Sequence, residues 1–582
     1  MQRRVLTVIV LFFLNSLLFA QSSPGYPKHY FRNPLGIPME LTSNFGELRS
    51  NHWHMGLDIR TRQKENYQIY AAADGYIAKV RIEPFGFGRS IFINHPNGLT
   101  TVYAHLNDFF PELEKYVTEQ QYKQESWEIE LDILKNKIPV FKSQLIAYSG
   151  NTGSSQGPHL HFEIRDTKTN KCLNPLLFGF PVNDNIAPVA LKLAMYDRSK
   201  SVYDQGPQIF SLKKTGESYT LRNAAVIKTG SRKASFAIQA FDREFRTGNP
   251  NGIYYAKIYF DEKPLIEFRL DSIDYSESMY VNAQIDYKYR SEGGSYLQHL
   301  SVLPGDKGKV NRKINGDGTI FLDDSLIHTV LIEIKDAYRN TSLVNFNIQY
   351  DESLAKPKSE EKPAEKFFPN NKNVLRRAGF ELEIPAAGLY DTVDVQYFHA
   401  KSEKPFAVSS LHMVNDQSVP VHSNLSVRIK PDKEMPEILK NKLLMQRNTK
   451  SSIRKAKWQD GWLTAQFSDF GSYQLFVDTI PPELGEPDSF LRGKDTLDLS
   501  TLKNIVFNPN DNFGTVKNFR AELDGKWLRF TNDKGRFYIY TFDERCPYGV
   551  HHLKVTVEDL VGNVTTRSWW FKRDLYTPSQ KK

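Results

Sequence analysis

Short apolar runs separated by Gly, Asn and Pro fill the chain between Tyr30 and about Phe180. They include QIYAAADGYIAKV, RSIFINH, LTTVYAHL and QLIAYSG, which begin at residues 68, 89, 99 and 144. Runs of this length, bounded by turn-forming residues, are typical of β-strands joined by tight turns. The pattern therefore predicts a β-rich domain over residues 28–182.

Residues 110–137 interrupt this pattern. The run PELEKYVTEQQYKQESWEIELDILKNK is polar, highly charged and partly helical in its period. It predicts an insertion in the β-rich domain. Because long insertions commonly act as lids or as docking surfaces, we expect this one to restrict access to a neighbouring site, with an inert surface loop as the alternative.

Beyond Pro188, apolar and polar positions alternate in many runs rich in Tyr and Phe, such as SFAIQAF, GIYYAKIYF, TVLIEI and VNFNIQY. Alternation with a period of two is the signal of a strand. The segment 352–371 is charged, contains proline and is poor in apolar residues, which is typical of a linker. The pattern predicts a mainly β fold class, with β-rich, sandwich-like domains over residues 186–351, 372–477 and 478–575.

One short signature occurs twice. An aspartate, a turn with asparagine and a last alternating strand are found in DAYRNTSLVNFNIQY, residues 336–350, and in EDLVGNVTTRSWWF, residues 558–571. The signature resembles the closing strands of bacterial immunoglobulin-like modules, which implies such a sandwich for residues 478–575 and offers it for residues 186–351. An all-β sandwich of another family fits the same residues.

Length and composition bound the class of protein. The chain has 582 residues, more than one hydrophobic core usually serves. With 40% hydrophobic and 25% charged residues, it is neither globally disordered nor a polytopic membrane protein. Cys172 and Cys546 are the only cysteines, so a disulfide scaffold is excluded and both thiols are expected to be unpaired.

The first residues predict export. Two arginines precede an apolar run from Val5 to Ala20, which is short for a bilayer span and typical of a signal peptide, so we expect a signal peptide over residues 1–20, with an uncleaved anchor as the alternative. Removing it takes away Arg3 and Arg4 and lowers the formal charge from +9 to +7 (9 − 2). This basic excess fits a solvated surface or contact with anionic polymers and indicates no nucleic-acid partner. The expected location is periplasmic, cell-envelope associated or extracellular.

Seven of the fourteen histidines lie within the first 161 residues, and most of them belong to three motifs. In NHWHMGLDIR, residues 51–60, His54 and Asp58 are four positions apart. That step places both side chains on one face of either a strand or a helix. In TVYAHL, residues 101–106, His105 ends an alternating run.

The third motif is the most specific. GNTGSSQGPHLHFEIR, residues 150–165, delivers His159 and His161 onto an alternating run, so both imidazoles face one side of a strand. Two histidines and an aspartate supply three protein ligands for zinc and leave the fourth position to water, as in catalytic zinc sites. The two remaining histidines are then suited to accept a proton from water and to stabilise the transition state.

These residues are similar to those of a known family. The motifs HMGLD, YAAADGYI, YAHL and GPHLHFE, which begin at residues 54, 70, 103 and 157, stand in the order seen in lysostaphin-like, LytM-type peptidoglycan endopeptidases. The resemblance covers about residues 40–167. It implies one Zn²⁺ per chain held by His54, Asp58 and His161, with His105 and His159 as catalytic histidines. It also implies a compact antiparallel β-sheet core with a narrow groove, and peptidoglycan peptides as substrate.

Several alternatives accompany this hypothesis. His52 is the nearest rival ligand, although the spacing of Gly56 and Asp58 favours His54; Glu163 shares the face of His159 and is expected to orient or pack. The chain could instead be a non-catalytic wall-binding or amidase-activating relative, or an adhesion or scaffold protein built on its β-rich domains. The complete set of ligand residues argues against both. Envelope proteins are candidate partners for the C-terminal β-rich domains.

Overall fold

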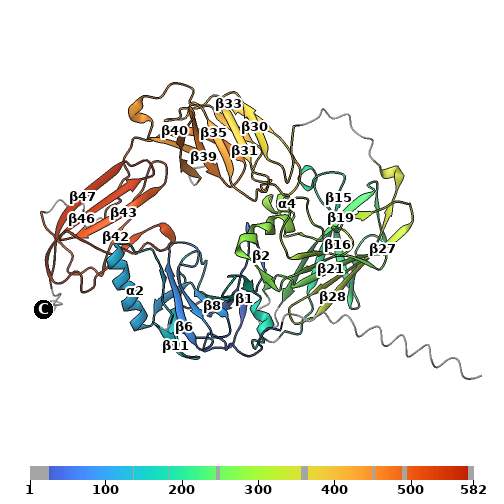
Figure 1. Ribbon diagram of the computed structural model, residues 1–582, viewed down its shortest axis with the longest axis horizontal. Helices are drawn as coiled ribbons and strands as arrows, with labels where there is room; N and C mark the ends of the chain where they lie inside the picture. The colour runs from blue at the N-terminus through green and yellow to red at the C-terminus, as the bar shows by residue number, and fades with distance from the viewer. Residues whose placement is uncertain are drawn as a thin grey trace, which may run out of the picture.

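Four β-rich bodies follow one another around a ring (Figure 1). The computed structural model describes residues 25–135, 137–182, 184–243, 249–355, 365–448, 452–487, 490 and 495–574. The predicted signal peptide, residues 1–20, and the middle of the predicted linker, residues 356–364, lie outside the described residues. We call the bodies first to fourth, for residues 25–182, 184–355, 365–478 and 479–574.

A twisted antiparallel sheet forms the centre of the first body. Its strands lie in the order β1-β4-β13-β8-β7-β6-β10. All six residues of β8 are buried, because elements cover this part of the sheet on both faces. The strands are β1 (Leu41–Ser43), β4 (Leu57–Arg60), β6 (Gly75–Ile82), β7 (Arg89–Asn94), β8 (Leu99–Ala104), β10 (Ile129–Asp132) and β13 (His159–Asp166).

A smaller sheet packs against the large one. It has the order β5-β12-β9, formed by β5 (Gln68–Tyr70), β12 (Leu145–Ser149) and β9 (Leu106–Phe109). Ile69, Ile146 and Phe109 of this sheet share one buried apolar cluster with Ile77 and Ile93 of the large sheet. The compact antiparallel core expected from the resemblance is therefore present.

The insertion consists of one helix and one strand. Helix α2 (Pro111–Gln124) starts with proline at its first position, where no backbone N–H is needed, and Glu125 ends it in the left-handed conformation. Leu113 and Val117 fasten the helix to the domain, and the chain then returns as β10 along the edge strand β6. The helical period in this part of the sequence corresponds to α2, and the assignment of residues 110–137 as an insertion stays a prediction.

The second body shares its core with the first. Its main strands run in the order β19-β15-β16-β17-β28-β27-β21-β22, and a single buried cluster joins residues such as Phe236 and Phe268 to Trp53 and Leu57 of the first body. In addition, β14 (Cys172–Leu173) pairs with β23 (Ser272–Ile273) across the boundary. The main strands are β15 (Val189–Asp197), β16 (Gln208–Thr215), β17 (Ser218–Leu221), β19 (Lys233–Arg243), β21 (Tyr255–Phe260), β22 (Lys263–Arg269), β27 (Ile327–Lys335) and β28 (Thr341–Tyr350).

The third body is a sandwich of two five-stranded antiparallel sheets that enclose one apolar cluster. One sheet has the order β30-β31-β35-β39-β38 and the other the order β33-β34-β40-β36-β37. Their strands are β30 (Asn373–Arg377), β31 (Phe380–Ile384), β33 (Tyr397–Ala400), β34 (Leu411–Val414), β35 (Leu425–Ile429), β36 (Leu443–Arg447), β37 (Ile453–Lys455), β38 (Lys457–Gln459), β39 (Trp462–Phe467) and β40 (Gly471–Val477).

The fourth body closes the ring against the first (Figure 1). Its larger sheet, β41-β47-β46-β43-β44, faces the pair β42-β45 over a separate apolar cluster. Leu444 and Phe476 of the third body pack with Phe513 and Val561 of the fourth. The strands are β41 (Leu497–Asp498), β42 (Asn504–Phe507), β43 (Val516–Leu523), β44 (Lys526–Trp527), β45 (Tyr538–Thr541), β46 (Gly549–Asp559) and β47 (Val564–Arg573).

The repeated sequence signature forms the same turn twice, ahead of β28 and of β47. In the fourth body, Asp559 accepts hydrogen bonds from the backbone N–H groups of Val561 and Asn563, and the Asn563 amide donates to the carbonyl oxygen of Asp478. Asp336 and Asn340 make the corresponding bonds in the second body. Burial raises the pKa of both Asp336 and Asp478 to about 6. The immunoglobulin-like assignment built on this signature stays a prediction.

The mainly β fold class is confirmed. Cys172 and Cys546 are unpaired and buried, as their number predicted. Among the residues described, none of the helices has both the length and the apolarity to cross a bilayer.

The shared core makes a stability prediction. Leu270 is fully buried where the first and second bodies meet, whereas 41% of Leu191 on β15 is exposed. Leu270→Ala should lower the free energy of unfolding by about 2–5 kcal/mol, because it leaves a cavity in a close-packed core. Leu191→Ala should change it by less than about 1 kcal/mol. Urea denaturation followed by tryptophan fluorescence measures both, and equal effects would contradict a core shared across the boundary.

Candidate metal centre

Strand pairing brings two of the predicted ligands together. β4 and β13 are antiparallel neighbours whose register places Asp58 directly opposite His161. Directly opposed residues project from the same face of a sheet. His159 precedes His161 by two positions and shares this face.

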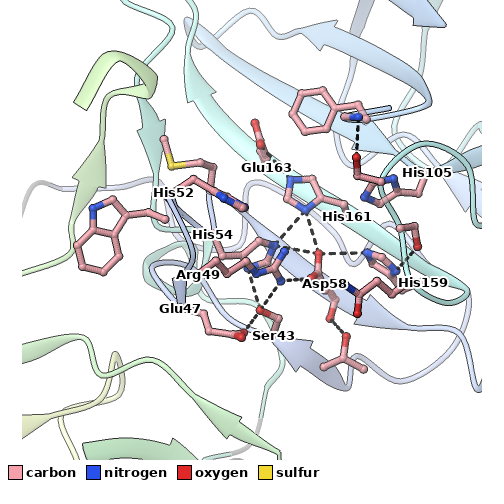
Figure 2. A pocket seen from close by; sticks show the side chains of 18 of the residues that line it. Ser43, Glu47, Arg49, His52, His54, Asp58, His105, His159, His161 and Glu163 are labelled. Carbon is pink, nitrogen blue, oxygen red and sulfur yellow. Dashed lines mark hydrogen bonds and ion pairs between the residues drawn. The ribbon is translucent and has the colours of Figure 1, made fainter. Parts of the chain in front are cut away.

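His54 lies in the loop before β4, and its side chain reaches Asp58 and His161 from there. Gly56 makes this possible, because a Cβ there would lie 2.5 Å from the carbonyl oxygen of Phe162 and 3.0 Å from His161 Nε2. The ligand atoms of His54, Asp58 and His161 all lie within 4.8 Å of one another (Figure 2). The structure thus brings together the three residues predicted to bind zinc. His52, the rival, is exposed, and its ring Nδ1 bonds the carbonyl oxygen of Ser50 and not the ligand atoms.

Hydrogen bonds select which imidazole nitrogens face this point. His54 Nδ1–H donates to the carbonyl oxygen of Asn44 at 2.7 Å, which leaves Nε2 free, 2.9 Å from Asp58 Oδ1. His161 Nε2–H donates to Glu163 Oε1 at 2.9 Å, which leaves Nδ1 free, also 2.9 Å from Asp58 Oδ1. Two neutral imidazole nitrogens and one carboxylate oxygen are donors that suit a divalent zinc ion.

The charges in the centre are strongly coupled. Burial alone would raise the pKa of Asp58, but the imidazoles of His54, His159 and His161 hold that pKa well below its usual range. Burial lowers the pKa of His54 to about 4. Burial also disfavours the charged form of His161, but the carboxylates of Asp58 and Glu163 outweigh it and raise the pKa to about 9. A cation at this point would take the place of the proton on His161, which needs the neutral ring to act as a ligand.

His105 and His159 lie beside the three candidate ligands, with ring centroids 4.8 Å apart (Figure 2). His105 has a left-handed backbone conformation, φ 60°, which is uncommon outside glycine. Its backbone N–H donates to the carbonyl oxygen of Phe87. His105 Nδ1–H donates to the Thr152 carbonyl oxygen at 2.8 Å, so its Nε2 is unprotonated in the neutral ring. Burial lowers its pKa to about 3.

His159 is held in the same manner. Its Nδ1–H donates to the carbonyl oxygen of Gly157 at 2.8 Å, and its Nε2 lies 3.3 Å from Asp58 Oδ1. The side chain is 15% exposed, more than those of the three candidate ligands. Both histidines therefore present Nε2 beside the ligand triad.

A buried network behind His161 connects the site to the second body. Glu163 Oε2 accepts a hydrogen bond from Arg165 Nε at 2.6 Å, and Tyr275 of the second body donates its hydroxyl to Glu163 Oε1 at 2.5 Å. Burial by itself would raise the pKa of Glu163, but Arg165 and His161 lower it to about 2. A carboxylate that fixes the ring of a metal-binding histidine also raises its basicity as a ligand.

The five residues lie at the base of a cleft of about 1020 Å³. Arg49, Glu83 and Phe87 of the first body line it, together with Tyr275 and Tyr296 of the second. None of the insertion's described residues lines this cleft, although Gln124, Ser126 and Glu128 line a second hollow that shares Arg81 and Glu83 with it. That the insertion restricts access stays a prediction. α2 faces the fourth body, because its return strand β10 adds to the far edge of the sheet, away from β4 and β13.

Sequence reasoning missed the contributions of Arg49 and Tyr275. Arg49 Nη2 donates to Asp58 Oδ2 at 2.7 Å. It lies in β2 (Leu48–Arg49), which pairs with β3 (His52–Trp53) in a short two-stranded hairpin. Neither residue belongs to a recognisable motif, and Tyr275 is more than 100 positions away from Glu163, so only the fold brings them to the site.

Comparison with family models gives a match at this site. Residues 52–122 match peptidase family M23, a range that includes His54, Asp58 and His105. This part of the chain is a peptidase family M23 domain. Residues 364–478, which make up the third body, match a Zu5-like domain.

Curated relatives are similar to less than a third of the chain. An uncharacterized metalloprotease of Haemophilus influenzae is 28% identical over 173 residues, which is 29% of this chain and 31% of that protein. Peptidoglycan DD-endopeptidase ShyA of Vibrio cholerae is 29% identical over 25% of this chain and 29% of its own length. DD-carboxypeptidase/endopeptidase Mpg of Neisseria meningitidis is 30% identical over 22% of this chain and 23% of its own length. The chain therefore spans less than a third of the length of these relatives.

Solved structures also match about a quarter of the chain. A zinc-containing peptidase from Vibrio cholerae is 25% identical, with a TM-score of 0.19, over 25% of this chain and 39% of that one. The catalytic domain of the M23 protein EnpA from Enterococcus faecalis is 21% identical, with a TM-score of 0.19, over 25% of this chain and 95% of that domain. The assignment of the M23 domain follows from the sequence matches.

Glu163→Gln should weaken zinc binding about tenfold or more, because it replaces the carboxylate that fixes and polarises His161 by a neutral amide. Glu83→Gln is the matched control: Glu83 lines the same cleft but bonds the backbone N–H of Phe87. Competition with a chromophoric chelator measures both affinities. If the two variants bound zinc equally tightly, Glu163 would have no role in supporting the ligand.

Proposed function

We propose that this chain is an exported, zinc-dependent endopeptidase that hydrolyses peptide bonds of bacterial peptidoglycan. The observation that carries the proposal is the convergence of His54 Nε2, Asp58 Oδ1 and His161 Nδ1 at the base of the cleft, with two further imidazoles beside them. The M23 match and the peptidoglycan endopeptidases among the relatives support the substrate class. The intact ligand set favours an enzyme over a non-catalytic, wall-binding relative.

The donor set fits one zinc ion. The three ligand atoms approach one point while each histidine uses its other nitrogen to donate to a protein oxygen. Three protein ligands leave a position open to water and substrate, which separates catalytic from structural zinc. When bound there, zinc supplies the Lewis acidity that activates water and polarises a peptide carbonyl group.

His105 is suited to accept a proton from the attacking water. The Thr152 carbonyl holds the proton on Nδ1, so the Nε2 lone pair is available on the side of the ligand triad. His159 borders the open side of the cleft and, with Nε2 protonated, can donate a hydrogen bond to the oxyanion that develops on the scissile carbonyl. Both side chains are oriented in advance by backbone carbonyl groups.

The cellular setting forms part of the proposal. A periplasmic or envelope-associated location would give the M23 domain access to peptidoglycan, and the three further β-rich bodies offer surfaces for envelope partners. Export follows from the predicted signal peptide alone.

The metal assignment predicts about one zinc per chain, and each of His54→Ala, Asp58→Ala and His161→Ala should lose it, because three ligands leave no redundancy. His52→Ala, which removes a histidine of the same cleft outside the triad, should keep it. Metal analysis after dialysis measures the stoichiometry. Stoichiometric zinc in the triple variant would refute the assignment.

The catalytic assignment predicts a different outcome for the remaining histidines. His105→Ala and His159→Ala should retain zinc but reduce the rate of peptidoglycan hydrolysis by about 10²- to 10⁴-fold, since they act in the transition state. Mass spectrometry of the fragments released from purified peptidoglycan gives the rate. Wild-type rates in both variants would show that these histidines have other roles.

A further inference from the structure

The fourth body touches the rim of the M23 cleft through a short loop. The loop follows β44 and contains Asp533, Lys534 and Gly535. Lys534 has the left-handed conformation, φ 58°, and its backbone N–H donates to the carbonyl oxygen of Pro84. Gly535 lies so close to Phe85 that a Cβ would come within 2.4 Å of the ring. The loop is thus fitted closely to residues 84 and 85 of the first body.

The two charged side chains of this loop reach a second segment of the cleft. Asp533 Oδ1 accepts a hydrogen bond from the backbone N–H of Gly153 at 2.8 Å. Lys534 Nζ donates to the carbonyl oxygen of Ser155 at 2.7 Å. Both bonds involve an ionised group and are therefore stronger than a bond between neutral partners. Ser154, Ser155 and Gln156 line the cleft beside these contacts.

The segment held in this way fixes both imidazoles proposed to act on water and substrate. Thr152, next to Gly153, provides the carbonyl oxygen that accepts from His105 Nδ1–H. Gly157 provides the carbonyl oxygen that accepts from His159 Nδ1–H, and the Ser155 hydroxyl donates to that same oxygen at 2.7 Å. The orientation of both rings therefore depends on where residues 152–157 lie.

Within its own body this segment is tied mainly to the chain around Gly86 and Arg89, and Thr152 Oγ1 also donates to the carbonyl oxygen of Leu106 at 2.9 Å. Ser154 N–H donates to the carbonyl oxygen of Gly86, Gly86 N–H donates to Ser154 Oγ, and Arg89 N–H donates to Thr152 Oγ1. The fourth body bonds both sides of this arrangement, at Pro84 and at Gly153 and Ser155, and so adds to the contacts that fix where residues 152–157 lie.

The insertion provides the second half of the contact. Arg529 Nη1 donates to Thr118 Oγ1 and Gln121 Oε1 of α2, and Arg520 pairs with Glu125 at 2.7 Å. The rings of Tyr122 and Trp527 meet edge to face at 5.2 Å. Residues that are more than 390 positions apart meet here, which gives the insertion a role as a docking surface for the chain's own fourth body.

This interface differs in kind from the other three in the ring. The first and second bodies share one apolar cluster, and apolar clusters also join the second to the third and the third to the fourth. As far as the described residues go, the apolar cluster of the fourth body contains no residue of the first. A mainly polar interface is typical of contacts that open and close.

We propose that Asp533 and Lys534 are positioning residues of the peptidase site: they hold residues 152–157, and through them His105 and His159, in the orientation needed for hydrolysis. The proposal rests on the proposed endopeptidase function. It makes full activity depend on closure of the ring, although neither residue contacts the ligand triad among the described residues.

The test compares the full-length chain with the variants Asp533→Ala, Lys534→Ala and the double variant. Release of fragments from purified peptidoglycan gives kcat and KM, and hydrogen–deuterium exchange of the peptide covering residues 150–158 reports the contact itself. We expect kcat to fall about 10- to 100-fold in the double variant, because small displacements of reacting groups are costly. KM and zinc content should stay unchanged, and exchange of this peptide should rise.

Conservative and distant variants separate positioning from general damage. Lys534→Arg keeps a donor for Ser155 and should restore most of the rate. Arg529→Ala weakens docking on α2, far from the cleft, and should lower kcat in the same direction. Lys572→Ala is the control, because Lys572 pairs with Asp574 and Asp498 of the fourth body itself.

The outcomes are distinct. A double variant with wild-type kcat, or with unchanged exchange of residues 150–158, overturns the positioning proposal and leaves the endopeptidase function in place. A wild-type chain that binds zinc but releases no fragments overturns the endopeptidase function, and with it the role assigned to the loop.

Discussion

The antiparallel pairing of β4 with β13 sets Asp58 directly opposite His161, and the geometry of the metal centre depends on this register. Side chains alternate between the faces of a sheet, so a slip of one residue would turn His161 away from Asp58. The hydrophobic pattern prevents such a slip, because Leu57, Ile59, Leu160 and Phe162 are all fully buried. The same residues that form the core therefore also hold the ligands in place.

Burial of so many charges requires that each has a partner. Asp58 is bonded by Arg49 and adjoins three imidazoles, while Glu163 lies between His161 and Arg165. Removal of one partner would leave a buried charge unpaired, which is costly, whereas a bound cation adds a favourable partner for Asp58. The low pKa of Asp58 and the raised pKa of His161 have the same cause: the buried carboxylates favour a positive charge beside them.

The second and fourth bodies both contact the M23 domain near its cleft. The second body completes the first one's core, provides two tyrosines to the cleft and bonds Glu163. The fourth body reaches the opposite rim through Asp533 and Lys534. The ring thereby brings residues from both of its arms to the cleft, and α2, whose position in sequence suggested a lid, forms part of the ring closure.

The sequence by itself determined the strands, through alternating apolar positions, and it indicated His54, Asp58, His105, His159 and His161, because short motifs hold these residues on few elements. It also predicted an insertion with helical character and two unpaired cysteines. Arg49, Tyr275, Asp533 and Lys534 were decided only by the tertiary structure. Their partners are brought near by a hairpin or by whole bodies of the ring, and side-chain contacts across hundreds of residues leave no periodic or local pattern in the chain. The docking of α2 on the fourth body was decided for the same reason, since it depends on which edge of the sheet β10 joins.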